Sequence, residues 1–205
     1  MTVRVQPAVD LAALIGSRIC HDLISPLGAI GNGVELLSMS GVAASPEMSL
    51  IAESVENANA RIRFFRIAYG AAAAGSLLGR SEVVEILQGL SKGGRQSIQW
   101  QIAAPLERRL VKLGLLCLQC LESALPWGGR ILVETAPDGW TLTAEAGKLR
   151  DLDALWQVFD GRGDMAVLTP AEVQFALAPS WAAEIGWRLS RRAAPGGMEL
   201  GFRPR

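Results

Sequence analysis

The sequence predicts an α+β protein, in which a hairpin of two long helices precedes an α/β sandwich of helices on one face of a sheet. Over the first part of the chain, apolar residues recur every three or four positions, which is the period of a helix face. Beyond it, short strand-like runs alternate with helical segments. A linker of small residues, 70–79, separates the two patterns, so we expect domains at 1–75 and 76–205.

The first helix should run from about Asp10, a suitable N-cap, to about Met39. Pro26 falls inside it, where a proline removes a backbone donor and should bend the helix. At roughly 100° per residue, the apolar stripe of this helix lies opposite His21. The stripe consists of Leu11, Ile15, Ile19, Leu23, Leu27, Ile30, Val34 and Leu37.

The second helix should begin after the turn 41–45, at Ser45-Pro46-Glu47, which supplies an N-cap, a first-turn proline and an acid. One hairpin cannot bury two full apolar stripes, so we expect a homodimer whose two hairpins form a four-helix bundle. The alternative is that the C-terminal region covers the second stripe. This second stripe, on the second helix, has nearly the spacing of a heptad repeat and consists of Ile51, Val55, Ala58, Ile62, Phe65 and Tyr69.

The C-terminal region should begin with a short helix at 81–87, a strand at 96–102 and a buried helix at 106–125. Strands at 130–134 and 139–145 should pair around the turn Ala136-Pro137-Asp138-Gly139. Helices near 152–159 and 169–185 follow, and then a last strand pair. Those strands are expected at 187–191 and 198–202.

Composition limits the possible functions. Half of the 205 residues are hydrophobic, and the 20 basic side chains are balanced by 20 acidic ones. The chain therefore lacks the excess of basic residues that is typical of nucleic-acid-binding proteins. Residues 1–10 have no long apolar run, and the stretch 69–78 is too short to span a membrane. We therefore expect a cytoplasmic protein with no membrane partner. Its three cysteines, an odd number, fit reduced thiols in that compartment.

The chain contains a single histidine, His21, and the acidic Asp22 follows it directly. On its side of the helix the neighbouring side chains are mostly small or polar, so we expect the imidazole to point outward without a bulky shield. Such a position suits a nucleophile whose partner is another protein rather than a small molecule in a cleft. Those neighbours are Ser17, Arg18, Ser25, Gly28 and Asn32.

The residues around His21 resemble a known motif. His21-Asp22-x-x-Ser25-Pro26-Leu27 is similar to the H-box of two-component histidine kinases. The stretch 11–37, followed by the sequence Ala-Arg-Ile-Arg-Phe-Phe-Arg-Ile-Ala-Tyr-Gly-Ala-Ala at 60–72, more narrowly resembles the ChpT-type histidine phosphotransferases of alphaproteobacteria. The likeness is diffuse after residue 75, where the α/β sandwich resembles the ATPase domain of histidine kinases.

This resemblance implies a cell-cycle phosphorelay. His21 would take phosphate from the receiver domain of a hybrid histidine kinase and pass it to response regulators, including a DNA-binding cell-cycle regulator. Asp22 would hold the ring tautomer or offset its charge, and Ser25 would orient a hydrolytic water. The plainer alternatives are an ordinary exposed helix carboxylate for Asp22 and solvated helix faces for the arginines. Candidate contacts to the receivers are Arg18, Gly28, Asn32, Arg61, Arg63 and Arg66.

The C-terminal region lacks the residues with which a kinase ATPase domain binds ATP. Helix 115–124 has no asparagine for Mg²⁺, and Glu145-Ala146-Gly147 lacks the aspartate and the second glycine of an adenine loop. The best remnant of the phosphate lid is Gly161-Arg162-Gly163-Asp164. We therefore expect no bound cofactor, with Mg²⁺ carried by the receiver. The alternatives are a divergent ATP-using histidine kinase and a non-catalytic dimeric scaffold that binds receivers.

A zinc site is a weaker hypothesis. Cys117-x-x-Cys120, together with Cys20 and His21, could supply four ligands. However, the Cys117–Cys120 pair lies in an apolar helix, where small buried cysteines are common, so we expect no metal site.

Overall fold

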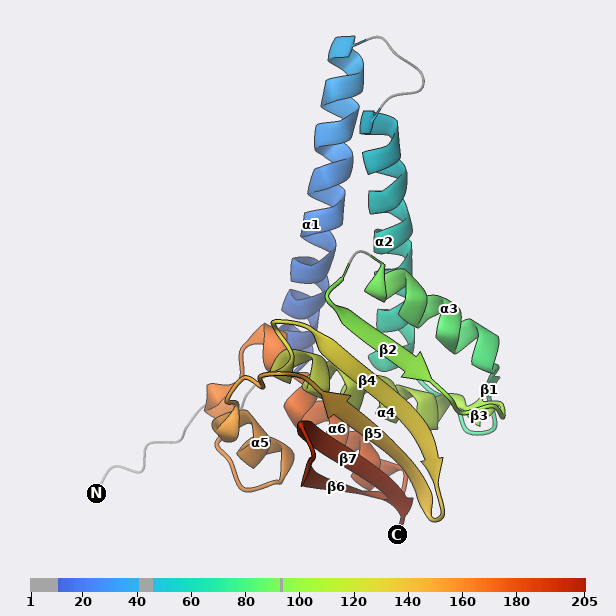
Figure 1. Cartoon of the computed structure of the whole chain (residues 1–205), viewed down its shortest axis with the longest axis vertical. Helices are drawn as coiled ribbons and strands as arrows, with labels where there is room; N and C mark the ends of the chain where they lie inside the picture. Colours follow the sequence, from blue (N-terminus) through green and yellow to red (C-terminus); the bar gives the residue numbers. More distant parts are fainter. Residues whose placement is uncertain (1–10, 41–45, 93) are drawn as a thin grey trace, which may run out of the picture.

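The computed structural model describes residues 11–40, 46–92 and 94–205 (Figure 1). Helices α1 (Leu11–Ser40) and α2 (Pro46–Ala68) form the expected hairpin, and α1 continues through Pro26. The predicted N-cap Asp10 and the turn 41–45 lie outside the described residues. Figure 1 shows that the upper part of the hairpin stands clear of the rest of the protein, whereas its lower end meets the other helices.

The main sheet has five strands in the order β2-β4-β5-β7-β6 (Figure 1). Its first two strands are parallel, and the other neighbours are antiparallel. Pairing of Ala136 with Gly139 confirms the predicted turn. The strands are β2 (Gln96–Trp100), β4 (Gly129–Ala136), β5 (Gly139–Glu145), β6 (Trp187–Ala194) and β7 (Gly197–Pro204). A second, two-stranded sheet that the sequence did not predict joins β1 (Leu77–Leu78) to β3 (Leu106–Glu107).

The remaining helices confirm the predicted order, apart from an additional 3₁₀ turn at Met165–Val167 and two helices that begin differently. The first two residues of the expected helix at 106–125 form strand β3 instead. The first part of the expected helix at 169–185 forms a separate 3₁₀ turn. Helices α4 and α6 lie behind the sheet in Figure 1. The helices are α3 (Arg80–Ser91), α4 (Arg108–Ala124), α5 (Asp153–Phe159), α6 (Gln174–Glu184), and the 3₁₀ turns η1 (Met165–Val167) and η2 (Pro170–Glu172).

The core lies between the sheet and these helices. Strand residues alternate in burial, so Ile131, Val133 and Leu142 are fully buried on the helix side. Trp140 is the aromatic centre, with the rings of Trp100, Trp187 and Phe202 at centroid distances of 5.9, 6.2 and 5.8 Å. This core gives the helical hairpin a rigid base.

The second apolar stripe is divided between two environments. At its lower end Phe65 is only 6% exposed and belongs to the core, where α2 packs on α3 and α4. Higher up, Val55 and Ile62 are 41% and 50% exposed. The expectation of one continuous seam facing a second copy was therefore wrong for the lower end, because the C-terminal unit covers Phe65 there. Among the described helices, none combines the length and the apolar run needed to cross a membrane.

Candidate functional site

His21 lies in the middle of α1, but its side chain is outside the described part of the structure. Its predicted outward orientation therefore remains a prediction. Ser25, Gly28 and Asn32, on the following turns, are exposed. A Cβ atom added to Gly28 would meet nothing within 4 Å, so the surface beyond Ser25 is open. These residues leave room on α1 for a protein partner.

Asp22 is held between two arginines. Its Oδ2 lies 2.7 Å from Arg18 Nε, one helical turn away, and 3.8 Å from Arg61 Nη1 on α2. Arg61 is itself oriented, because its Nε donates a 3.0 Å hydrogen bond to Asn57 Oδ1. The Asp22 side chain is only 9% exposed. Asp22 is therefore a mostly covered, ion-paired carboxylate, and its part in phosphate transfer remains a prediction.

A hollow between α1 and α2 brings several predicted site residues together. Asp22 and Ser25 line it from α1, and Arg61 lines it from α2. Their side chains combine an acid, a hydroxyl and a cation beside the turn that carries His21. The other lining residues are Pro26, Ala29, Leu50, Glu53, Ser54 and Asn57.

The four arginines predicted to contact a partner have different surroundings. Arg63 pairs with Glu85 of α3 at the surface, and Arg66 is exposed. Arg18, in contrast, is only 18% exposed, and its Nη1 donates a 2.7 Å hydrogen bond to the carbonyl oxygen of Ala171. Arg18 therefore makes an intramolecular contact with η2 that the sequence did not predict.

Glu122 of α4 is a member of this charged group that sequence reasoning missed. Burial raises the pKa of its carboxyl to about 7, whereas the nearby charges of Arg18 and Arg61 lower it and that of Asp22 raises it. Glu122 stands in a run of apolar residues, so the helix was predicted simply as a buried element. A single acid within such a run was the available signal, because an acid seldom stands among the apolar residues of a helix that packs into a core.

The two cysteines of α4 are packing residues. Cys117 and Cys120 are fully buried, and burial raises the pKa of both thiols well above its ordinary value. A buried, protonated thiol is a poor metal ligand and nucleophile. Within the described residues, no three His, Cys, Asp or Glu side chains gather as a metal cluster.

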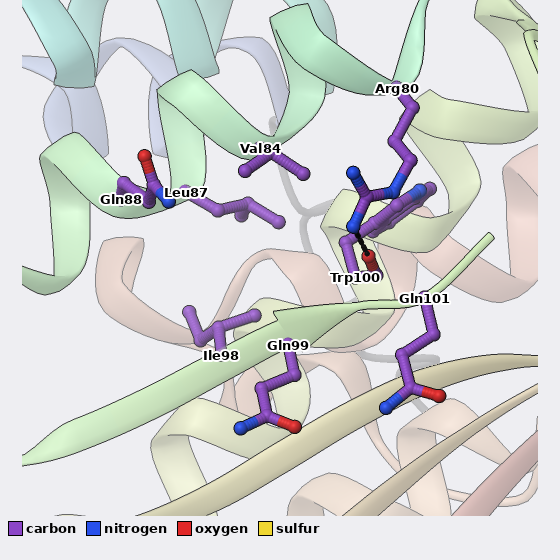
Figure 2. A pocket seen from close by; sticks show the side chains of 8 residues that line it. All are labelled: Arg80, Val84, Leu87, Gln88, Ile98, Gln99, Trp100 and Gln101. Atoms are coloured by element: carbon purple, nitrogen blue, oxygen red, sulfur yellow. Dashed lines mark hydrogen bonds between the residues drawn. The ribbon is translucent and has the colours of Figure 1, made fainter. Parts of the chain in front are cut away.

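A second hollow lies between α3 and β2 (Figure 2). Its wall is apolar at Val84, Leu87 and Ile98 and is edged by glutamine amides. Arg80 is the one charged residue among the side chains that line it, and its Nη2 donates a 3.3 Å hydrogen bond to the carbonyl oxygen of Trp100. This hollow contains no group able to accept a phosphoryl group, so the hairpin site is the stronger candidate.

The chain resembles known phosphotransferases in sequence and in fold. The chain is 42% identical over 128 residues to the protein phosphotransferase ChpT of Brucella abortus (strain 2308), a match that covers 62% of this chain and 61% of that protein. Thus the chain spans about three fifths of its curated relative. A solved bacterial phosphotransferase matches 97% of the chain and 98% of its own length, at 31% identity and a TM-score of 0.77.

The family comparison covers the C-terminal unit. The model described as "Histidine phosphotransferase C-terminal domain" matches residues 80–196, which is more than half of the chain and includes the region from α3 to β6. The N-terminal hairpin lies outside the matched residues, so the phosphoacceptor role of His21 stays a prediction. The chain belongs to the histidine phosphotransferase family.

Proposed function

We propose that this protein is a histidine phosphotransferase of a multistep phosphorelay, which moves phosphate between receiver aspartates through His21. The observation that carries the proposal is the setting of Asp22. It directly follows the chain's single histidine, and it is held by Arg18 and Arg61 with only 9% of its side chain exposed. Membership of the histidine phosphotransferase family supports the same reaction class.

The chemistry needs one nucleophile. A neutral imidazole nitrogen of His21 attacks the phosphorus of a receiver's aspartyl phosphate, so that a P–N bond forms while the P–O bond to the aspartate breaks. Only the neutral form of the imidazole carries a nitrogen lone pair that can attack. Asp22 would accept a hydrogen bond from the ring or offset its positive charge. A second receiver aspartate then takes the phosphoryl group by the reverse reaction.

The partners follow from this reaction. The donor would be the receiver domain of a hybrid histidine kinase, and the acceptors would be response regulators, including a DNA-binding cell-cycle regulator. The open surface at Ser25, Gly28 and Asn32 supports docking of a receiver on α1. Arg61, Arg63 and Arg66 belong to α2 of the same hairpin and would face acidic groups of the partner. The receiver would bring its own Mg²⁺, and this chain would bind no nucleotide.

A homodimer is the second part of the proposal. The hairpin carries large apolar side chains with 41% to 58% exposure, among them Leu27, Leu50, Val55 and Ile62. A monomer in water rarely leaves such a group uncovered, and a second hairpin is the cover that a four-helix bundle supplies. We place the boundary between the dimerisation unit and the C-terminal domain near residue 75, after α2 and before β1. The site of action would be the cytoplasm.

The direct test is phosphate transfer from a labelled receiver domain of a hybrid histidine kinase. The wild-type protein should acquire label that is labile in acid and stable in base, and because the chain has one histidine, such label locates at His21. His21→Ala should acquire none, while its circular dichroism spectrum stays that of the wild type. Label on His21→Ala at a near wild-type rate would disprove the relay.

Two further outcomes separate the alternatives. Receiver binding by a wild-type protein that never becomes labelled would identify a scaffold. Label on His21 after incubation with ATP and Mg²⁺ alone would identify a divergent kinase.

A further inference from the structure

Arg18 connects the phosphoacceptor helix to the C-terminal domain. Its guanidinium contacts Asp22 Oδ2 through Nε at 2.7 Å, and through Nη1 it donates to the carbonyl oxygen of Ala171, also at 2.7 Å. Ala171 lies in η2, 153 residues further along the chain. One side chain thus joins the acid beside His21 to a backbone atom of another domain.

The Ala171 carbonyl is a fixed acceptor. The turn η2 is held by a capping box, in which the Thr169 side chain accepts from the backbone and Glu172 accepts from the Thr169 backbone N–H. The same carbonyl oxygen also accepts a 3.0 Å hydrogen bond from Nε2 of Gln174, whose side chain is completely buried. Because its position is set by the C-terminal core, this carbonyl can orient the Arg18 guanidinium rather than follow it.

Charged groups near Arg18 come from α1, α2 and α4. Asp22 faces it from its own helix, Arg61 faces the same carboxylate from α2, and Glu122 lies close by on α4. Tyr69, just after α2, is near enough for its hydroxyl to sense the Arg18 charge. In this setting a guanidinium, with its rigid and planar array of donors, can hold two acceptors in fixed directions, whereas a lysine ammonium cannot.

We propose that Arg18 is a positioning residue for transfer at His21. It fixes the Asp22 carboxylate in its working orientation because it is fixed itself by the C-terminal domain at Ala171. This inference rests on the proposed role of His21 as phosphoacceptor. The inference also assigns the C-terminal domain a role other than nucleotide binding. Through Ala171 and Arg18, that domain orients the Asp22 carboxylate beside His21.

The test compares three full-length variants in transfer from a phosphorylated receiver domain. Arg18→Gln removes the bridge, and Arg18→Lys keeps the charge without the two-way contact. Arg108→Gln is the matched control, because Arg108 Nη2 donates across the same domain boundary, to the carbonyl oxygen of Arg66 at 3.2 Å, without contacting Asp22. For each variant, the single-turnover rate constant at saturating receiver, the dissociation constant of the receiver and the thermal midpoint are measured.

Both Arg18 variants should transfer roughly ten- to a hundredfold more slowly at saturation, because small misplacements of a catalytic group cost rates of that order. Their receiver affinity should stay within about twofold of wild type. Arg108→Gln should shift the thermal midpoint as Arg18→Gln does, yet transfer at the wild-type rate.

A saturating rate for Arg18→Gln equal to that of Arg108→Gln would overturn the inference, and so would full rescue by Arg18→Lys. Weakened receiver binding at an unchanged rate would overturn it too, since Arg18 would then be a partner contact. A wild-type protein that never acquires label would overturn the proposed function as well. Labelling of the wild-type protein therefore distinguishes a failure of the proposed function from a failure of the inference about Arg18.

Discussion

The Tyr69 hydroxyl donates a 2.6 Å hydrogen bond to the amide oxygen of Gln119, and this bond fastens the end of α2 to the middle of α4. Gln119 is 4% exposed, and burial raises the pKa of the Tyr69 phenol. The phenol therefore remains a protonated donor throughout the physiological range. Hairpin and C-terminal domain thus share a polar contact within a mainly apolar interface.

Loss of this bond should destabilise the protein. Tyr69→Phe keeps the ring and leaves the Gln119 oxygen without its donor, at an expected cost of about 1–3 kcal/mol in the free energy of unfolding. Urea denaturation monitored by tryptophan fluorescence measures the change. In the double variant with Gln119→Leu, much of the loss should be recovered, because neither polar group is then left unpaired. Strictly additive losses would show that the bond contributes little.

The raised pKa of Glu122 predicts a pH dependence of stability. In the folded protein its carboxyl holds a proton up to a pKa of about 7, compared with 4.5 for the ordinary group. Between these values the folded state binds more protons than the unfolded state, so this group makes stability fall as pH rises from about 4.5 to 7. Glu122→Gln should flatten that fall and should be more stable than wild type at pH 8, by an amount on the order of 1–3 kcal/mol. Equal pH profiles of urea midpoints would contradict this.

Asp22→Asn should slow phosphate transfer much more than it disturbs the fold. The amide cannot offset a positive imidazole, and the loss of a positioned acid or base typically costs a factor of about 10² or more. The variant also leaves Arg18 and Arg61 without a carboxylate partner, so some loss of stability is expected. The saturating transfer rate and the thermal midpoint should be measured on one preparation. A wild-type rate would make Asp22 a purely structural residue.

Dimerisation should fail when a charge is placed on the exposed part of the second stripe. Ile62→Asp, at a position 50% exposed in the single chain, should give a folded monomer in sedimentation, because burying an unpaired carboxylate in a helix seam costs several kcal/mol. Phe65→Asp is the contrasting variant and should unfold the protein, since Phe65 is 6% exposed in the core. Sedimentation of the unmutated protein as a stable monomer would rule out the four-helix bundle.

ATP should not bind measurably, and incubation with ATP and Mg²⁺ should leave His21 unlabelled. In α4, Cys117 and Leu121 stand near the place where a metal-binding asparagine would be expected, and both are completely buried. The triphosphate would therefore lack its compensating ion. Calorimetry of the full chain with Mg²⁺-ATP, with an active histidine kinase as positive control, measures this. A micromolar affinity would favour the divergent kinase.

Local sequence signals predicted most of the fold because helix periodicity and turn residues act over a few positions. The break at Ser45-Pro46 and the turn at Gly139 placed element boundaries within a residue or two of those observed. The sequence did not predict β1 and β3, since strands of two residues have no period and their pairing joins distant segments. It also could not show that Phe65 is covered by the C-terminal domain.

The candidate site was predicted only in part, because some of its contacts join segments that are far apart in the sequence. The motif around His21 indicated Asp22 and Ser25, and the structure places both on the wall of one hollow. An arginine on a helix normally faces solvent, so nothing local distinguished Arg18, whose second partner is 153 residues away. Only the tertiary fold brings Arg18 to the Ala171 carbonyl.

The anchoring of the hairpin at only one end has a consequence for amide hydrogen exchange. Near Ala68 the helix is sealed into the core, so those amides exchange only through unfolding of the whole protein. Near Met48, 43% exposed, each turn of α2 faces α1 on one side and water on the other, and it can open by itself. Protection factors should therefore decline along α2 from its C-terminus to its N-terminus. A bound receiver or a second copy of the chain would raise the protection factors most at the N-terminal end of α2. The change of protection factor along this one helix would therefore report assembly directly.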